Sequence, residues 1–300
     1  MGESLKGKII KGIGGFYYVD CEDLKLYECK ARGVFRNKDV KPLVGDDCEI
    51  ERVEDSEKLT GNIISILPRR NTLIRPAAAN ADQAIIIFAA AYPEPHLGLL
   101  DRFLINMEQQ HVETIICFNK IDDGSPEAIA KIHEYADIYS KAGYRVLLTS
   151  AHTGEGVDKL REILKGKTSV LSGPSGVGKS SMLNALIPGF KAATGEISQK
   201  IKRGKNTTRH TELIRIDTNT YIMDTPGFSS MDFMNLTEND LMYMYREFEK
   251  YNDTCRFTGC VHMAEPGCSV KEAVEQGIIS KERYESYKSL FELLKSRRKY

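Results

Sequence analysis

Three features are missing from this 300-residue sequence: a net charge, a long hydrophobic run and an N-terminal signal segment. Its 42 basic and 42 acidic side chains balance, so contact with a polyanion has to come from local clusters. The most apolar run, AIIIFAAAY at 84–92, is too short to span a bilayer. No apolar core follows Met1-Gly2-Glu3, and Lys6 stands where a myristoylation signal needs Ser or Thr. We therefore expect a cytoplasmic protein that has no membrane partner.

The seven cysteines are an odd number, which argues against a disulfide framework. Four of them stand singly among predicted strands: Cys21, Cys29, Cys48 and Cys117. The other three lie close together near the C-terminus. This usage is typical of reduced thiols in the cytoplasm.

The chain divides into three regions by pattern. Residues 5–67 hold about five short runs with β-type alternation and no convincing helix, which predicts a small barrel, followed by a linker that begins at Pro68. From residue 84, predicted strands alternate with predicted helices, which indicates a mostly parallel sheet covered by helices on both faces. The final part, from about residue 236, is predicted to be helical. The fold class is therefore multidomain α/β, with domains at 1–68, 69–235 and 236–300.

The segment SGPSGVGKSS matches the phosphate-loop pattern G-x-x-x-x-G-K-[ST], with a predicted strand before it and a helix after it. Its backbone N–H groups can surround phosphates, Lys179 can reach the β and γ oxygens, and the Ser180 hydroxyl can bind Mg²⁺. The alternative is an ordinary glycine-rich turn between a strand and a helix. The candidate nucleotide-binding residues are Gly173, Pro174, Ser175, Gly176, Val177, Gly178, Lys179, Ser180 and Ser181.

Asn119-Lys120-Ile121-Asp122 follows the predicted strand TIICF and predicts recognition of guanine. A carboxylate at Asp122 can accept hydrogen bonds from N1–H and the 2-amino group of guanine, whereas adenine has no such pair of donors. The aliphatic part of the Lys120 side chain would cover the guanine ring, and Asn119 would fix the conformation of the loop. One strand later, Ser150 and Ala151 stand where a backbone N–H can meet the guanine O6.

Asp224-Thr225-Pro226-Gly227 follows the predicted strand YIMD. Asp224 would hold Mg²⁺ through water, and the Gly227 N–H would contact the γ-phosphate. Two loop hydroxyls upstream, Thr207 and Thr208, are candidates to complete the Mg²⁺ shell, with Thr208 assigned as the ligand. The candidate catalytic residues are Lys179, Ser180, Thr207, Thr208, Asp224 and Gly227.

The five motifs of a GTPase are thus all present, but the base-reading motifs precede the phosphate loop. In this order the chain resembles the RsgA (YjeQ/YloQ) family of circularly permuted bacterial GTPases. The resemblance covers nearly the whole chain. It implies an OB-fold barrel that contacts ribosomal RNA, a GTPase stimulated by the 30S ribosomal subunit, and a role in late 30S maturation. The expected partners are GTP or GDP, the 30S subunit and its 16S rRNA, and we expect a monomer.

The clustered cysteines have the spacing Cys255-x₄-Cys260-x-His262-x₅-Cys268. Three thiolates and one imidazole form a closed tetrahedral shell, which predicts one structural zinc ion, whereas a catalytic site would leave a position open. The alternative is chance clustering in a reduced protein. The resemblance to the RsgA family supports the same four ligands.

Two substitutions concern hydrolysis. Phe228 follows the DTPG motif where many GTPases have a glutamine that orients water, and a phenylalanine cannot form that hydrogen bond. Members of the RsgA family usually carry a histidine before the threonine pair, and this chain has Asn206 there. His210 lies four positions further on, but we do not assign to it the catalytic role of the family's histidine. We therefore expect a low intrinsic rate of hydrolysis.

Contact with RNA is expected from local charge. The loop between 197 and 211 carries Lys200, Lys202, Arg203, Lys205 and Arg209 without an acidic residue, and the chain ends KSRRKY. Each run alone is typical of solvated surface, but together with a barrel they favour RNA.

Two alternatives to an RNA-associated GTPase remain open at this stage. GPSGVGKS also resembles the loop of guanylate kinases, which bind guanine, but DTPG and NKID would then be unexplained. The other alternative is an RNA-binding module in which GTP acts as a switch and hydrolysis is incidental, as Phe228 and Asn206 would allow.

Overall fold

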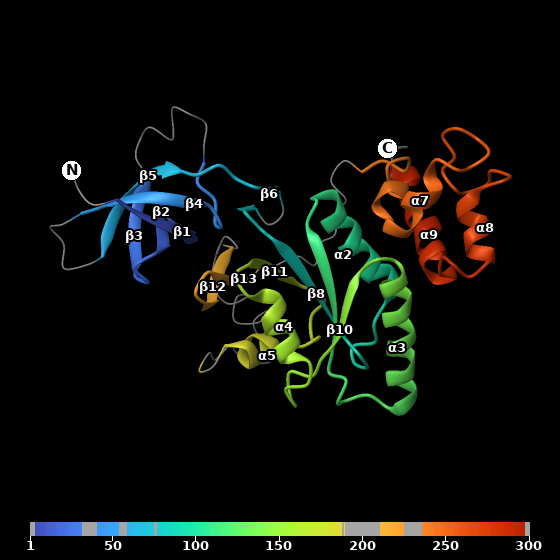
Figure 1. The fold of residues 1–300 in the computed structure, drawn as a ribbon, viewed down its shortest axis with the longest axis horizontal. Coiled ribbons are helices and arrows are strands. Elements are labelled where there is room, and N and C mark those ends of the chain that lie inside the picture. The colour runs from blue at the N-terminus through green and yellow to red at the C-terminus, as the bar shows by residue number, and fades with distance from the viewer. Residues whose placement is uncertain are drawn as a thin grey trace. The chain divides into compact units, whose positions relative to one another are not determined.

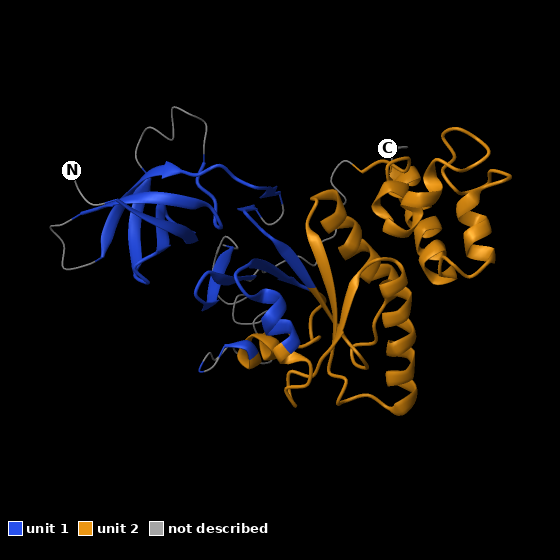
Figure 2. Ribbon diagram, viewed as in Figure 1, with its two compact units in different colours: residues 1–85, 159–172, 186–228 blue, residues 86–158, 173–185, 229–300 orange. Residues whose placement is uncertain are grey.

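The computed structural model describes residues 4–31, 41–53, 59–74, 77–187, 189, 211–224 and 236–297, with only the backbone described at Asp224. The chain forms two compact units, each built from separate stretches (Figure 2). Unit 1 contains residues 1–85, 159–172 and 186–228, and unit 2 contains residues 86–158, 173–185 and 229–300. No helix in the described ranges has the length and apolar character needed to cross a membrane.

The N-terminal part of unit 1 is a closed barrel of five strands (Figure 1). They are β1 (Ser4–Ile13), β2 (Phe16–Cys21), β3 (Leu26–Ala31), β4 (Asp47–Arg52) and β5 (Thr60–Ile66). Strand β1 pairs with both β2 and β4, β2 pairs with β3, and β5 closes the circle between β3 and β4. The inward side chains, such as Ile9, Val19 and Ile50, form its core, as the alternating pattern requires. The predicted OB-type barrel is confirmed.

The predicted linker after the barrel has structure of its own. Two short strands, β6 (Thr72–Leu73) and β7 (Ala78–Ala79), pair with each other. The Arg69 guanidinium donates to both carboxylate oxygens of Asp46, at 2.7 and 2.8 Å, and Asp46 is fully buried. A bidentate pair of this kind fixes the chain at the exit from the barrel.

The rest of unit 1 brings together three strands that flank the predicted nucleotide motifs. Strand β11 (Thr168–Ser172) pairs in parallel with β13 (Thr220–Asp224), and β13 forms an antiparallel hairpin with β12 (Glu212–Asp217). On its other edge, β12 pairs with barrel strand β1 at Lys11 and Glu212. Helix α4 (Val157–Leu164) leads into β11.

Unit 2 holds the other strands of the α/β region, with the order β8, β9, β10. They are β8 (Gln83–Ala89), which begins in unit 1, β9 (Glu113–Asn119) and β10 (Arg145–Leu148), and β9 and β10 are parallel. Every residue of β8 is buried, as expected for an interior strand of a sheet covered on both faces. The helices are α2 (Leu97–Gln109), α3 (Pro126–Lys141) and α5 (Lys179–Leu186). The predicted alternation of strands and helices is confirmed.

The sequence explains where the longest of these helices begins. Ser125 lies in the N-cap position of α3, and its hydroxyl accepts a hydrogen bond from the Ala128 N–H. Pro126 then occupies the first turn, where its missing N–H costs nothing. The helix therefore starts four residues after Asp122, so the base-reading loop is short and anchored at both ends.

The C-terminal part of unit 2 is helical, as predicted. Its elements are η2 (Leu241–Met244), η3 (Arg246–Phe248), α7 (Glu249–Asn252), α8 (Ser269–Glu275) and α9 (Lys281–Arg297). A cluster of aromatic rings fills its core, with Tyr245 stacked on Phe248 at 5.0 Å between centroids and Tyr287 packed against both at 5.3 and 5.1 Å.

A buried ion pair joins this helical part to α2 and α3. The Arg283 guanidinium, 2% exposed, donates to both carboxylate oxygens of Glu247, at 2.7 and 3.0 Å, and to Asp101 on α2. The Tyr139 hydroxyl on α3 donates to the same Asp101 carboxylate at 2.7 Å, and the guanidinium lies 4.4 Å from the centre of the Tyr245 ring. Removing the cation would leave two buried carboxylates without a counter-charge.

We predict that Arg283→Met lowers the free energy of unfolding by about 3–5 kcal/mol, the usual result of removing one partner of a buried pair. Chemical denaturation followed by circular dichroism measures this loss. Lys141→Met is the control, because the Lys141–Asp137 pair is exposed, and its expected effect is about 0.5 kcal/mol or less. An equal loss in the two variants would contradict a structural role for Arg283.

Candidate functional site

The phosphate loop, 173–178, connects β11 to α5 and follows a path that only glycine permits. Gly173 has φ +141° and Gly178 has φ +97°. A Cβ on Gly173 would lie 2.1 Å from the Ile87 carbonyl oxygen, so the loop passes directly over the backbone of β8. Val177 is buried beneath the loop, whereas Ser175 and Gly176 at its rim are exposed.

Lys179 begins helix α5, and its side chain turns back over the loop. Its Nζ donates to the carbonyl oxygens of Gly173 and Pro174, at 2.7 and 2.6 Å. The ammonium therefore lies against the backbone of the predicted phosphate loop. Ser180, the candidate Mg²⁺ ligand, follows in the first turn of α5 and is partly exposed.

Asn119 fastens the base-reading loop to the phosphate loop. Its side chain is buried, its Nδ2 donates to the Val177 carbonyl oxygen at 3.0 Å, and its Oδ1 accepts from the Ala151 N–H at 3.0 Å. One amide thus joins three segments that are separate in the sequence. The Ala151 N–H, one of the backbone donors in the segment that we expected to face the guanine O6, donates here to Asn119.

Lys120 makes the second link. Its Nζ donates to the carbonyl oxygens of Gly176, at 2.7 Å, and Tyr92, at 3.0 Å. Its backbone has φ +66°, a left-handed conformation that turns the chain sharply after β9. The structure therefore brings the predicted guanine motif and the predicted phosphate loop together within unit 2.

Asp122, the predicted reader of guanine, is an ionised acceptor. A hydrogen bond from Ser150 lowers the pKa of Asp122 below its usual value, and His152 adds to the effect, with its Nδ1 at 3.2 Å from Oδ2. Ser150 is itself buried, and its Oγ accepts from the N–H of His152 and of Thr153. Ser150 thus shapes its own loop and lowers the pKa of the Asp122 carboxyl.

Three contacts were missed from the sequence: the carbonyls of Ile87 and Tyr92, and the His152 side chain. Carbonyl contacts leave no signal in residue type. His152 directly follows Ser150 and Ala151, and its position next to the motif is the signal that could have drawn attention to it.

The remaining predicted catalytic residues are described only in part. The Asp224 backbone ends β13 and pairs with Leu171 at the end of β11. Thr207, Thr208, Gly227, Asn206 and Phe228 lie outside the described residues, as do all five cations of the basic loop.

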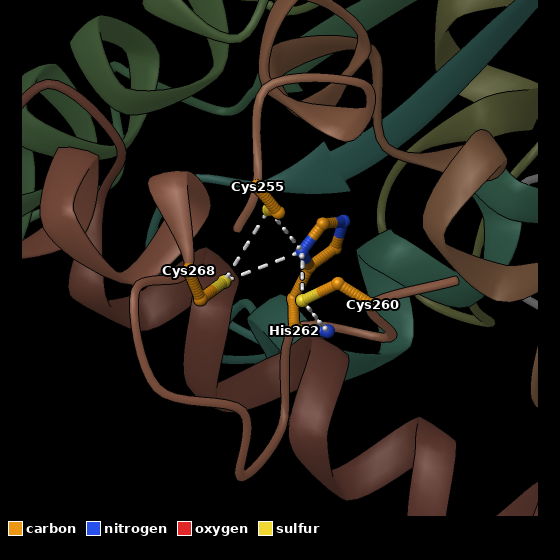
Figure 3. Close-up of side chains that lie close together, drawn as sticks. All are labelled: Cys255, Cys260, His262 and Cys268. Atoms are coloured by element: carbon orange, nitrogen blue, oxygen red, sulfur yellow. Dashed lines mark hydrogen bonds between the residues drawn. The ribbon is translucent and has the colours of Figure 1, made fainter. Parts of the chain in front are cut away.

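The three clustered cysteines and His262 converge on one point in the C-terminal part of unit 2 (Figure 3). The His262 Nδ1 lies 3.6 Å from the Sγ of Cys255, 3.5 Å from that of Cys260 and 3.3 Å from that of Cys268. The Sγ atoms of Cys255 and Cys268 are 3.9 Å apart. A tetrahedral metal with bonds of about 2.1–2.3 Å places its ligand atoms about 3.4–3.8 Å apart, so this donor set fits one ion.

The surroundings hold His262 in the form that binds metals. Burial lowers its pKa, which favours the neutral ring. Its Nε2 lies 2.9 Å from the Asn252 Oδ1, so an Nε2–H donor leaves the Nδ1 lone pair facing the sulfurs. Burial also raises the pKa of the Cys260 thiol to about 12, so metal binding has to displace its proton. Asn252 was missed by sequence reasoning.

The four other cysteines, on β2, β3, β4 and β9, are buried free thiols. Burial raises the pKa of Cys21 and Cys29 to about 12, which keeps them protonated and unreactive.

We predict that Gly178→Ala weakens GDP binding at least about tenfold, because strain of this kind costs about 1–3 kcal/mol. The new Cβ would lie 2.3 Å from the Asn119 Nδ2 and would force the base-reading loop away from the phosphate loop. Titration calorimetry measures the affinity. Gly166→Ala is the matched control, since Gly166 also has positive φ, +70°, but no atom within 4 Å of the added Cβ. If Gly178→Ala bound GDP with wild-type affinity, the close approach of Gly178 to Asn119 would not be needed for nucleotide binding.

Comparison with known proteins agrees with this site. The family model described as RsgA GTPase matches residues 66–234, and that described as RsgA N-terminal domain matches residues 6–59. The chain is 54% identical to the small ribosomal subunit biogenesis GTPase RsgA of Agathobacter rectalis, over 99% of this chain and 100% of that protein. It is 48% identical to the protein of the same name from Alkaliphilus metalliredigens, over 98% of this chain and 99% of that protein.

Two solved structures share the fold over nearly the whole chain. YjeQ from Thermotoga maritima has a TM-score of 0.84 and 36% identity, and covers 97% of this chain and 99% of its own. YloQ, described as a circularly permuted GTPase, has a TM-score of 0.79 and 36% identity, and covers 98% of this chain and 96% of its own. With a barrel, a phosphate loop that follows its base-reading motif and a Cys₃His cluster all present, this chain belongs to the RsgA family of circularly permuted GTPases.

Proposed function

We propose that this protein hydrolyses GTP to GDP and phosphate and assists biogenesis of the small ribosomal subunit. The observation that carries the proposal is the docking of the base-reading loop on the phosphate loop through Asn119 and Lys120. It brings the residues that can read guanine next to the loop that can hold phosphates. Relatives named small ribosomal subunit biogenesis GTPase support the biological role. Family membership does not favour the nucleotide kinase alternative.

The residues of this nucleotide site have separate roles in binding. The backbone of the phosphate loop, from Gly173 to Ser181, surrounds the phosphates, and Lys179 neutralises their charge. Asp122 accepts from guanine, with Ser150 holding the carboxylate in place. Asn119, Lys120 and Ala151 fix the loop around the base.

Mg²⁺ prefers hard oxygen donors, and the candidates in this chain are the hydroxyls of Ser180 and Thr208 and the carboxylate of Asp224. When bound with GTP, this ion neutralises charge on the β and γ phosphates. The Gly227 N–H is assigned to the γ-phosphate. Phe228 cannot hydrogen-bond the attacking water, so a group from the ribosomal subunit is proposed to orient it.

We further propose that the Cys₃His cluster binds zinc as a structural ion. Three thiolates favour zinc over the harder cations, and the shell has no open position for substrate. The domains are assigned to 1–68, 69–235 and 236–300, with the barrel as the contact to 16S rRNA. The protein is proposed to act as a monomer in the cytoplasm.

The zinc proposal predicts one zinc ion per chain in the purified protein and none in Cys260→Ser, as measured by atomic absorption. Because the free energy of binding structural zinc is about 10 kcal/mol or more, the C-terminal helices should unfold in this variant. Cys29→Ser, a buried cysteine of the barrel, is the control and should keep its zinc. Zinc retained at wild-type content in Cys260→Ser would refute the ligand assignment.

For the function itself, we expect purified 30S subunits to increase the rate of GTP hydrolysis at least about tenfold, since groups supplied in trans are worth about 10³ or more. Phosphate release at fixed salt measures this rate, with 50S subunits as the control. Lys179→Ala should abolish hydrolysis with and without subunits. Full activity in Lys179→Ala would refute the assigned site, and transfer of phosphate to GMP would indicate a kinase. Intact binding without stimulation would favour a GTP switch with incidental hydrolysis.

A further inference from the structure

A buried carboxylate links the barrel to the β12–β13 hairpin in unit 1. Asp20 lies near the end of barrel strand β2 and is only 8% exposed. It accepts two hydrogen bonds, one from the Arg215 Nη1 at 2.9 Å and one from the Tyr221 hydroxyl at 2.8 Å. The two donors come from different strands, Arg215 from β12 and Tyr221 from β13. One barrel side chain is therefore hydrogen-bonded to both strands of the hairpin.

The two donors are partners within the hairpin. Arg215 and Tyr221 face each other in the register of β12 and β13, so Asp20 binds the hairpin near its turn. A second contact lies toward the end of the hairpin that begins at Glu212, where Lys11 of β1 pairs with Glu212 through the backbone and through its Nζ at 3.0 Å. Two points of attachment resist both sliding and rotation of the hairpin against the barrel.

The hairpin also lies beside the strand that leads to the phosphate loop. The Tyr221 N–H donates to the Lys167 carbonyl at 2.9 Å, and β13 pairs in parallel with β11 up to Leu171 and Asp224. Tyr221 stands three residues before Asp224, the candidate Mg²⁺ residue, which is about 10 Å along a strand. Glu212 stands four residues after Thr208 in the sequence. Both Mg²⁺ motifs thus adjoin the strands that Asp20 holds.

Hydrogen bonds transmit a small displacement of β2 to the hairpin better than apolar packing does. Hydrogen bonds to a carboxylate weaken steeply when the donor moves or turns, whereas an apolar contact tolerates small displacements. Burial of Asp20 strengthens this dependence, because water cannot replace a lost donor. A small displacement of β2 is therefore transmitted to both strands of the hairpin.

We propose that Asp20 is a positioning residue for GTP hydrolysis, acting through Arg215 and Tyr221 on the hairpin that ends at Asp224 and begins four residues after Thr208 in the sequence. Binding of RNA to the barrel thereby displaces the β12–β13 hairpin of unit 1 and alters the rate of hydrolysis. The proposal rests on the proposed function, because it assumes that the partner of the barrel is the ribosomal subunit. Because Asp20 is bonded to both strands of the hairpin, we also expect the replacement of GDP by GTP to alter the barrel strands β1 and β2.

The test compares Asp20→Asn and Tyr221→Phe with Asp23→Asn. Asp23 is a matched control, because its carboxylate also accepts from a tyrosine hydroxyl of unit 1, that of Tyr27 at 2.8 Å, but within the described ranges it forms no hydrogen bond to the hairpin. For each variant, subunit affinity, KM for GTP and kcat are measured with and without 30S subunits. We expect kcat on the subunit to fall at least about fivefold in the first two variants, the lower end of typical coupling. Subunit affinity, KM and the melting temperature of the barrel should change little.

Wild-type stimulation in both Asp20→Asn and Tyr221→Phe would overturn the proposal, as would a loss of rate that only follows a loss of subunit affinity. If Asp20→Asn does not fold, Tyr221→Phe decides, since it retains the Asp20–Arg215 ion pair. Asp23→Asn should behave as the wild type throughout.

A second measurement separates this proposal from the proposed function, because it needs no subunit. Hydrogen exchange of the amides of β1 and β2 is compared between GDP and a non-hydrolysable GTP analogue. We expect a difference in the wild type and in Asp23→Asn, and its loss in Asp20→Asn and Tyr221→Phe. If subunits do not stimulate the wild type but this pattern is found, the proposed function fails and the coupling stands. If the wild type shows no difference between the nucleotides, the coupling is refuted.

Discussion

The buried amide of Asn119 joins the two halves of the nucleotide site. It donates to the Val177 carbonyl under the phosphate loop and accepts from the Ala151 N–H of the following loop. A buried amide without hydrogen-bond partners costs about 1–3 kcal/mol, so separation of these three segments is unfavourable. Gly178 has to lack a side chain because the Asn119 amide occupies that space. The reversed order of the motifs is possible because these contacts depend on spatial neighbours, not on chain order.

Much of this fold follows from patterns that residue type reveals. Alternation with period two in the first 67 residues predicted a barrel, and strands alternating with helices from residue 84 predicted the parallel sheet. The phosphate loop, NKID and the Cys₃His spacing were visible because their chemistry needs particular side chains. The contact between the Lys120 ammonium and the Tyr92 carbonyl could not be predicted, since every residue has a carbonyl group.

Long-range polar contacts were equally hidden. Asp20 and Arg215 are 195 residues apart, and Arg283 and Asp101 are 182 apart, with no local motif around either pair. Each pair consists of common residue types that are usually found in solvent, and only the fold shows that they are buried. These contacts attach the barrel to the β12–β13 hairpin and the C-terminal helices to α2, which hydrophobic periodicity cannot specify.

The interleaving of the two units along the chain has a consequence for synthesis. Unit 1 uses residues 1–85 but also 159–172 and 186–228, and unit 2 extends to the last residue. The barrel can close on its first 66 residues, since its five strands pair with one another. Neither unit can be completed until its late segments have left the ribosome, and such distant pairing is slow. In the nascent barrel, β1 already pairs with β2 and β4, and only its stretch around Lys11 lacks a partner until Glu212 has been synthesised.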